Sequence, residues 1–173
     1  MIFCIYGPSC AGKTTLARRL AEALDIPMRS CGDEVRQRAA SLNMLIADLP
    51  DKIHREIDNA TVGWALRHRH CLVDGRFLDA VFVGHAGSVV MIELVASKAS
   101  RGIREQNRQK SLNTPQTEHI EQADADDVAF RARMFNLREL LQPNIRVDTS
   151  ELTVEICAQQ IRAYIETWLA QPA

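Results

Sequence analysis

The chain has 173 residues, enough for one compact domain with a hydrophobic core and too few for two full domains. Hydrophobic residues make up 46% of it and the formal net charge is −1, which excludes disordered and collagen-like proteins. The same charge balance, with only 5% aromatic residues, argues against nucleic acid as a partner, and no apolar run approaches the roughly 20 residues of a membrane helix.

The cysteines predict a reducing environment. All five are widely spaced and none forms a CxxC pair, which argues against both a disulfide framework and a zinc site. The apolar start at residues 1–6 is too short for the core of a signal peptide. We therefore expect a cytoplasmic protein, a monomer rather than an obligate oligomer, with small molecules as its partners and no membrane.

Short apolar runs alternate with longer helical patterns along the chain, which predicts βαβ units in a parallel sheet with helices on both faces. The expected strands, in chain order, are Ile2–Tyr6, Pro27–Ser30, Cys71–Asp74, Ser88–Val95 and Asn144–Asp148. The expected helices are Lys13–Leu24, one that follows a turn at residues 30–36, Asp51–His70, Asp127–Leu141 and Thr153–Leu169. Residues 106–121 lack apolar periodicity and read as a mobile loop or loosely held helix ends. No linker divides the chain, so residues 1–173 form one domain.

A phosphate-binding loop is the strongest signal. Residues 7–14 match G-x-x-x-x-G-K-[ST] in full, directly after an apolar strand and at the start of a helix. Gly7 and Gly12 let the backbone wrap a phosphate, Lys13 supplies a full positive charge, and the Thr14 hydroxyl is a ligand for Mg²⁺. The predicted nucleotide-binding residues are Gly7, Pro8, Ser9, Cys10, Ala11, Gly12, Lys13, Thr14 and Thr15. Cys10 stands where many such loops carry glycine; we interpret it as a tolerated variant rather than a redox group.

The third strand ends in Asp-Gly-Arg, which places polar groups at the carboxyl edge of the sheet, where ligands of such sheets bind. Asp74 is predicted to hold Mg²⁺ through water, and Arg76 to bind an acceptor phosphate with two hydrogen bonds. The plainer alternatives are a turn-forming aspartate and a surface arginine. Arg36, in the turn and helix after the second strand, is a candidate for a second contact to that phosphate, or else a solvated arginine.

Three arginines, Arg101, Arg104 and Arg108, share one face if residues 101–108 are helical, as in a lid that closes over phosphates. A solvated basic face is the alternative interpretation. Arg131 and Arg133 lie in the helix expected at residues 127–141, and at most one of them can face the ligand-binding cleft. We favour Arg133 because it lies nearer the apolar stripe.

These segments together resemble the nucleoside monophosphate kinases, most closely the archaeal-type cytidylate kinases. The resemblance implies a P-loop NTPase-type α/β/α fold, with a five-stranded parallel sheet in the order 2-3-1-4-5 and a helical lid. It also implies an acceptor-binding segment around residues 31–65, the lid around residues 100–133, the substrates ATP and CMP or dCMP, and Mg²⁺. The segments that carry it are the loop at residues 7–14, the turn at 31–36, Glu56-Ile57-Asp58, Val73-Asp74-Gly75-Arg76, Arg101-x-x-Arg104, residues 126–133 and residues 147–150.

By position, the resemblance implies roles for individual residues. Lys13 and Thr14 take the donor phosphates and the metal, Arg36 and Arg76 take the acceptor phosphate, and Arg101, Arg104 and Arg133 stabilise the negative charge on the transferring group. Asp33 is a further candidate for binding the substrate. Cys10, Ala11, Met134 and the stretch at residues 77–86 depart from the family pattern.

The sequence thus predicts transfer of the ATP γ-phosphoryl group to a small phosphorylated acceptor. Such an acceptor is already an anionic nucleophile, so alignment and charge neutralisation suffice. Two alternatives stay open. One is a kinase for a hydroxyl acceptor, which needs a base such as Asp33, Glu34 or Asp74. The other is a regulatory module that binds a nucleotide without catalysis.

Overall fold

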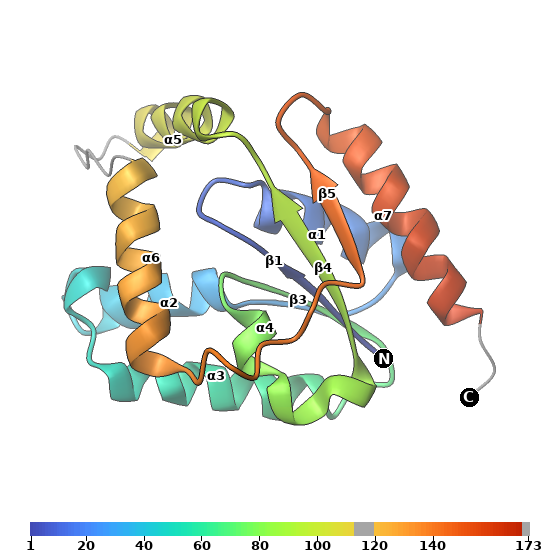
Figure 1. Cartoon of the computed structure of the whole chain (residues 1–173), viewed down its shortest axis with the longest axis horizontal. Helices are drawn as coiled ribbons and strands as arrows, with labels where there is room; N and C mark the ends of the chain where they lie inside the picture. The colour runs from blue at the N-terminus through green and yellow to red at the C-terminus, as the bar shows by residue number, and fades with distance from the viewer. Residues whose placement is uncertain (113–119, 171–173) are drawn as a thin grey trace.

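The computed structural model describes residues 1–112 and 120–170 (Figure 1). Its elements follow one another as β1 (Ile2–Tyr6), α1 (Lys13–Leu24), β2 (Met28–Ser30), α2 (Cys31–Ser41), η1 (Ile46–Asp48), α3 (Asp51–Ala65), β3 (Cys71–Gly75), α4 (Leu78–Val81), η2 (Val83–Ser88), β4 (Val89–Val95), α5 (Lys98–Leu112), α6 (Ile120–Met134), β5 (Ile145–Asp148) and α7 (Val154–Leu169).

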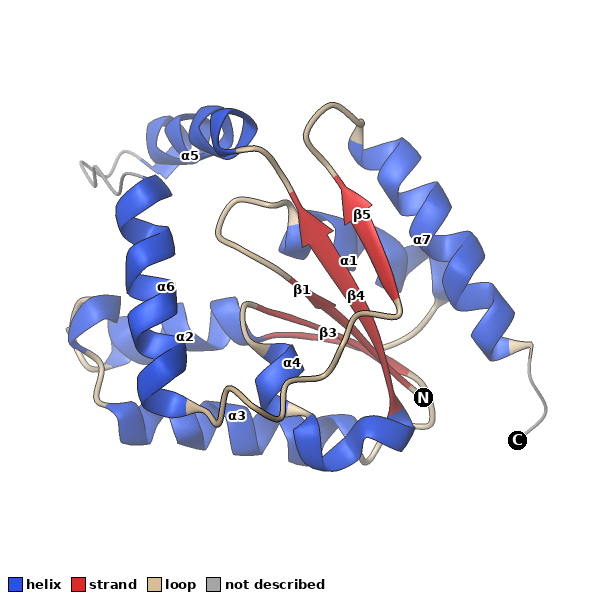
Figure 2. Cartoon of the chain, in the orientation of Figure 1, coloured by secondary structure: helices blue, strands red, loops and turns tan. Residues whose placement is uncertain are grey.

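The strands form one parallel sheet in the order β2-β3-β1-β4-β5, which confirms the expected fold class (Figure 2). In the central pairings, Tyr6 at the end of β1 lies opposite Gly75 of β3 and Glu93 of β4. Because all strands run the same way, the segments that follow β1, β3, β4 and β5 all leave at one edge. Three segments therefore meet at that edge: the phosphate loop after β1, the Asp-Gly-Arg turn after β3, and the start of α5 after β4.

Helices cover both faces of the sheet, and each face has its own hydrophobic core. On one face, α1 and α7 pack through Leu16, Leu20, Ile161 and Ile165 against alternate residues of the central strands. On the other face, Ala65 of α3 and Leu78 of α4 pack against the remaining residues of the same strands. Strands buried on both faces read as continuous apolar runs, which is why the sequence pattern located them well.

The bounds expected for α6 are wrong. The helix expected at Asp127–Leu141 begins seven residues earlier, at Ile120, and ends at Met134. After Met134 the chain turns, because the Asn136 side chain accepts a hydrogen bond from the backbone N–H of Arg138 and the backbone N–H of Leu141 bonds to the carbonyl of Asp79. For residues 106–121, expected as a mobile loop or loosely held helix ends, the structure shows helix ends: residues 106–112 continue α5 and residues 120–121 begin α6, while residues 113–119 lie outside the described residues.

α3 is also shorter than expected. It ends at Ala65, and turns lead to β3 over residues 66–70. The Nδ1 atom of His68 lies 2.9 Å from the carbonyl oxygen of Trp64, so this side chain occupies the end of the helix. Among the described residues, no helix combines the length and apolar character needed to cross a membrane.

Candidate active site at the carboxyl edge of the sheet

The phosphate loop between β1 and α1 depends on three residues in left-handed backbone geometry. Gly7 has φ +140°, and a Cβ there would meet the carbonyl oxygen of Leu94 at 2.1 Å. Gly12, with φ +92°, precedes the helix, and Cys10 adopts φ +60°, which is uncommon for a residue with a side chain. The loop therefore folds back over the start of α1, and the position of Cys10 is one where glycine would be unstrained.

Lys13 lies beneath this loop. Its ammonium donates a hydrogen bond of 2.6 Å to the carbonyl oxygen of Pro8. Desolvation lowers the pKa of Lys13 to about 8, and the positive charge of Arg76 adds to the effect. A cation held in this way is incompletely compensated, so an incoming phosphate anion would stabilise it.

Thr14 and Asp74 meet at the predicted metal position. The Thr14 hydroxyl donates a 2.7 Å hydrogen bond to Oδ2 of Asp74, while Oδ1 of the same carboxylate is buried and accepts no hydrogen bond. Burial raises the pKa of Asp74, although the hydrogen bond from Thr14 partly offsets the effect. A buried carboxylate oxygen without a partner fits a hydrated divalent cation. Among the described residues, no group of three or more His, Cys, Asp and Glu forms an all-protein metal site.

Two arginines of α5 point at the back of the phosphate loop. Arg101 is 4% exposed; its guanidinium lies 3.4 Å from the carbonyl oxygen of Ser9 and forms two 2.7 Å hydrogen bonds with the carboxylate of Asp124. Arg104 donates to the carbonyl oxygen of Cys10 at 3.3 Å and to the Thr149 hydroxyl and carbonyl. The shared face predicted for these arginines thus brings two of them to the loop.

Arg108 and Thr15 lie further from this arrangement. Arg108 forms an ion pair with Glu105, which is buried and accepts a 2.8 Å hydrogen bond from the thiol of Cys10. Burial, followed by this hydrogen bond, raises the pKa of Cys10, so its thiol is a poor nucleophile. Thr15 is exposed on α1.

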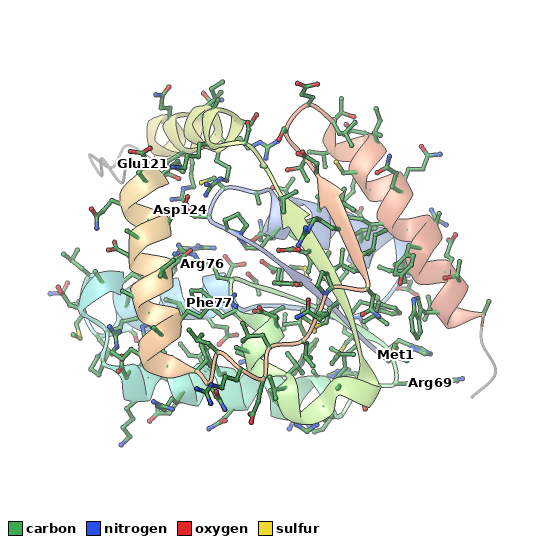
Figure 3. All side chains as sticks on the ribbon, viewed as in Figure 1. Met1, Arg69, Arg76, Phe77, Glu121 and Asp124 are labelled. Atoms are coloured by element: carbon green, nitrogen blue, oxygen red, sulfur yellow. The ribbon has the colours of Figure 1, made fainter. Side chains whose placement is uncertain are left out.

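The predicted acceptor residues also lie at this edge. Arg76 donates a 2.6 Å hydrogen bond to Asp127 of α6, and Figure 3 shows Arg76 and Phe77 beside that helix. Arg36 donates a 2.6 Å hydrogen bond to Asp33, which also accepts one from Arg18. Burial alone would raise the pKa of Asp33, but the two arginines outweigh burial and hold the pKa below its usual range.

The two arginines near the end of α6 point to different neighbours. Arg131 forms two hydrogen bonds, of 2.6 and 3.0 Å, with the buried carboxylate of Asp79. Arg133 bonds to Asp51 at the start of α3, and its side chain is 56% exposed. In this conformation Arg133 is therefore paired away from the phosphate loop, and its catalytic role stays a prediction.

Sequence reasoning missed the carboxylates that hold these arginines. Asp124, Asp127 and Asp79 pair with Arg101, Arg76 and Arg131 across elements. It also missed an aromatic group in which Phe77 stacks on Phe130 of α6 with ring centroids 5.2 Å apart. No local pattern reveals such pairs because their members are 23 to 53 residues apart; the run of acids at residues 124–127 was the available signal.

No protein-family model matches the chain. Curated relatives named cytidylate kinase come from three archaea. The one from Methanothermobacter thermautotrophicus is 36% identical over an aligned region that covers 58% of this chain and 66% of the relative. The one from Archaeoglobus fulgidus is 34% identical over a region that covers 51% of this chain and 52% of the relative. The third, from Methanosphaera stadtmanae, is 27% identical over 96% of this chain and 98% of its own length. The chain thus spans about two thirds of the length of the first relative, about half of the second and nearly all of the third.

These relatives support a P-loop nucleoside monophosphate kinase-like family for the chain. Solved structures support the fold of this P-loop kinase-like chain. A gluconokinase from Sinorhizobium meliloti has a TM-score of 0.65 at 15% identity. The match covers 96% of this chain and 91% of the gluconokinase. A shikimate kinase from Acinetobacter baumannii, in complex with shikimate, has a TM-score of 0.64 at 19% identity. The match covers 98% of this chain and 95% of the shikimate kinase.

Proposed function

We propose that the protein transfers the γ-phosphoryl group of ATP to a nucleoside monophosphate, with CMP or dCMP as the preferred acceptor. The observation that carries the proposal is the position of the guanidiniums of Arg101 and Arg104 against the carbonyls of Ser9 and Cys10 in the phosphate loop. This position brings two guanidiniums to the loop that would hold the donor phosphates, where positive charge would offset the negative charge that spreads during transfer. The archaeal relatives named cytidylate kinase supply the nucleotide class.

In this proposal the chain supplies charge and alignment. Backbone N–H groups of the loop and the ammonium of Lys13 bind the triphosphate of ATP. Arg76 and Arg36 bind the acceptor phosphate, and the arginines of α5 neutralise the transferring group. Mg²⁺, held by Thr14 and through water by Asp74, would reduce the charge repulsion between the phosphates when bound.

A hydroxyl acceptor fits less well. It would need a carboxylate to accept its proton. Residues 31–36, expected as a turn, form the start of α2, and the candidate there, Asp33, has its pKa held below the usual range by Arg36 and Arg18. A carboxylate with a lowered pKa is a weak general base. A phosphate acceptor does not require one.

The five cysteines are free thiols, which supports a proposed cytoplasmic location. We retain a monomer as the proposed state, without nucleic acid or a membrane as partner.

The deciding experiment measures ADP release from Mg·ATP with a panel of nucleoside monophosphates and, as controls, shikimate and gluconate. We expect release that depends on CMP or dCMP and is at least about 100-fold slower in Lys13→Met. Release that depends only on a hydroxyl acceptor would replace the proposal with the rival kinase. ATP binding without release for any acceptor would indicate a regulatory module.

A further inference from the structure

The thiol of Cys10 has a hydrogen-bond partner that the sequence did not indicate. Cys10 stands in the phosphate loop where many such loops carry glycine, and the sequence alone favoured a tolerated variant. In the structure its Sγ atom donates a 2.8 Å hydrogen bond to Oε2 of Glu105 on α5, 95 residues further along the chain. The side chain of Cys10 therefore links the phosphate loop to the helix that carries Arg101 and Arg104.

Glu105 is a buried carboxylate, 5% exposed. Burying a carboxylate is costly unless the group is paired and hydrogen-bonded. Arg108, one turn further along α5, donates to Oε1 of Glu105 at 2.8 Å and lies 2.6 Å from Oε2, so the negative charge has a cationic partner. The carboxylate can thus accept the hydrogen bond from Cys10 while Arg108 compensates its charge beside the loop that would hold phosphates.

The same helix also reaches the backbone of the loop. A guanidinium nitrogen of Arg101 lies 3.4 Å from the carbonyl oxygen of Ser9, and one of Arg104 lies 3.3 Å from the carbonyl oxygen of Cys10. The two arginines donate to peptide groups, whereas Glu105 accepts from a side chain. Residue 10 is therefore held by α5 through its carbonyl and through its thiol.

The backbone of Cys10 depends on such support. Its φ is +60°, a left-handed conformation that is disfavoured for a residue with a Cβ and that persists when surrounding contacts hold it. Because C=O and N–H of a trans peptide point in opposite directions, the N–H groups of Cys10 and Ala11 point away from α5. That of Ala11 points into the loop, at the carbonyl of Pro8 3.4 Å away. Left-handed residues that turn successive N–H groups to one side form anion-binding concavities.

We propose that Glu105 is a positioning residue for the phosphate loop. By accepting the hydrogen bond of the Cys10 thiol, it holds residue 10 in the left-handed conformation in which the loop binds the triphosphate of ATP. The inference rests on the proposed function and adds to it a contact that shapes the loop before ATP binds. Glycine at position 10 would adopt this backbone without strain and would need no such contact. If the binding conformation is only partly populated, the apparent affinity falls by the same fraction.

The first test compares Cys10→Ser with Cys10→Ala. Both replacements carry a Cβ in the left-handed backbone, but only serine keeps a donor for Glu105. In calorimetry we expect Mg·ATP to bind Cys10→Ser about three- to tenfold more tightly than Cys10→Ala, which is the size of one hydrogen bond. In turnover assays the KM for ATP should differ by the same factor, with kcat and the acceptor KM common to both variants. An equal Kd for Mg·ATP in the two variants overturns the inference.

The second test removes the acceptor. Glu105→Met keeps the length of the side chain and loses the carboxylate, so in this background Cys10→Ser and Cys10→Ala should bind Mg·ATP equally. The matched background is Glu121→Gln, an exposed carboxylate in the first turn of α6 that pairs with Lys98. There the difference between the two Cys10 variants should persist. A difference that persists in Glu105→Met as well overturns the role of Glu105.

These measurements separate the inference from the kinase proposal, because binding of Mg·ATP requires no acceptor. A parent that binds Mg·ATP and shows the Cys10 difference, but releases no ADP with any acceptor, overturns the kinase proposal and supports the inference. A parent that does not bind Mg·ATP overturns both. Where Glu105→Met does not unfold cooperatively, the first comparison decides, since it leaves Glu105 in place.

Discussion

At the scale of the residue, burial acts on charged groups at and beside the site. Lys13 is desolvated, Oδ1 of Asp74 is buried without a partner, and Asp58 is a partly buried carboxylate. Each of these states destabilises the free protein and would be relieved by a ligand of opposite character. Three predictions follow from individual side chains.

Binding of ATP should be accompanied by proton uptake above pH 8. The pKa of Lys13 is about 8 in the free protein, so at pH 8.5 much of it is neutral, and phosphates beside it would raise that pKa. We expect the calorimetric enthalpy of Mg·ATP binding to vary with the ionisation enthalpy of the buffer at pH 8.5 and much less at pH 6.5. Lys13→Arg, which stays charged, should bind without this buffer dependence. The same dependence in Lys13→Arg would assign the proton to another group.

Asp58→Asn should stabilise the fold at alkaline pH. The folded pKa of about 6 lies above the ordinary value, so the native state binds more protons than the unfolded state between about pH 4 and 6. Stability therefore falls as the pH rises through this window, and Arg55 on α3 and Cys31 on α2 are the titratable groups that face Asp58. In urea unfolding we expect Asp58→Asn to gain about 1 to 2 kcal/mol at pH 8 and almost nothing at pH 4. An equal gain at both values would show that the carboxylate is not strained.

Arg76→Ala should weaken the use of the acceptor. Loss of a charge-assisted hydrogen bond to phosphate corresponds to an increase in acceptor KM of about 10- to 100-fold. The KM for ATP should change little. The double variant Arg76→Ala, Asp127→Asn is the control, because the single change leaves Asp127 without its ion-pair partner. A parental acceptor KM in both variants would remove Arg76 from the acceptor site.

At the scale of the element, α6 is tied to three neighbouring segments by ion pairs, beside the stacking of Phe130 on Phe77. Figure 1 shows it running from α5 to α3 along the ligand-binding edge. Asp124 pairs with Arg101 of α5, Asp127 with Arg76 after β3, and Arg133 with Asp51 of α3. The guanidinium of Arg101 holds the pKa of Asp124 below its usual range. In the proposed function Arg76 and Arg101 bind phosphates, so substrate binding would replace Asp127 and Asp124 as their anionic partners.

Asp127→Asn should therefore tighten binding of the acceptor. The change frees a donor of Arg76 and removes a negative charge beside an incoming phosphate. We expect the KM for the acceptor to fall about three- to tenfold. Asp126→Asn is the matched control, because its carboxylate bonds only to Gln122 of the same helix in the described structure. A higher KM in Asp127→Asn would instead show that Asp127 positions Arg76 for binding.

At the scale of the whole molecule, ligands should stabilise the fold, because the site is assembled from segments that follow four strands. At 100 times its Kd, a ligand of the native state adds about 2.7 kcal/mol. For a chain of this size we expect Mg·ATP to raise the Tm by roughly 5 to 10 °C. Lys13→Met should unfold cooperatively near the parent's Tm and lose this increase. A full increase in Lys13→Met would contradict the assignment of the phosphate loop.

The sequence by itself determined the sheet and the phosphate loop. Strands such as β1 and β4 are buried on both faces and read as apolar runs, and the loop needs glycine where the backbone is left-handed or close-packed, as at Gly7. It determined little of α6, whose contacts to α5, α3 and the β3 turn are largely polar and leave no complete apolar stripe to mark its ends.

Only the tertiary structure decided which charges meet. Arg101 and Arg104 lie more than 90 residues from the loop carbonyls they contact, and a cavity beside Asp58 is built from three helices. Side-chain partners of this kind follow from the order of strands and the packing of helices, while local periodicity reports only which face of an element is buried. The phosphate loop was therefore readable from eight consecutive residues, whereas the carboxylates that pair with Arg76 and Arg101 were revealed only when distant segments were brought together.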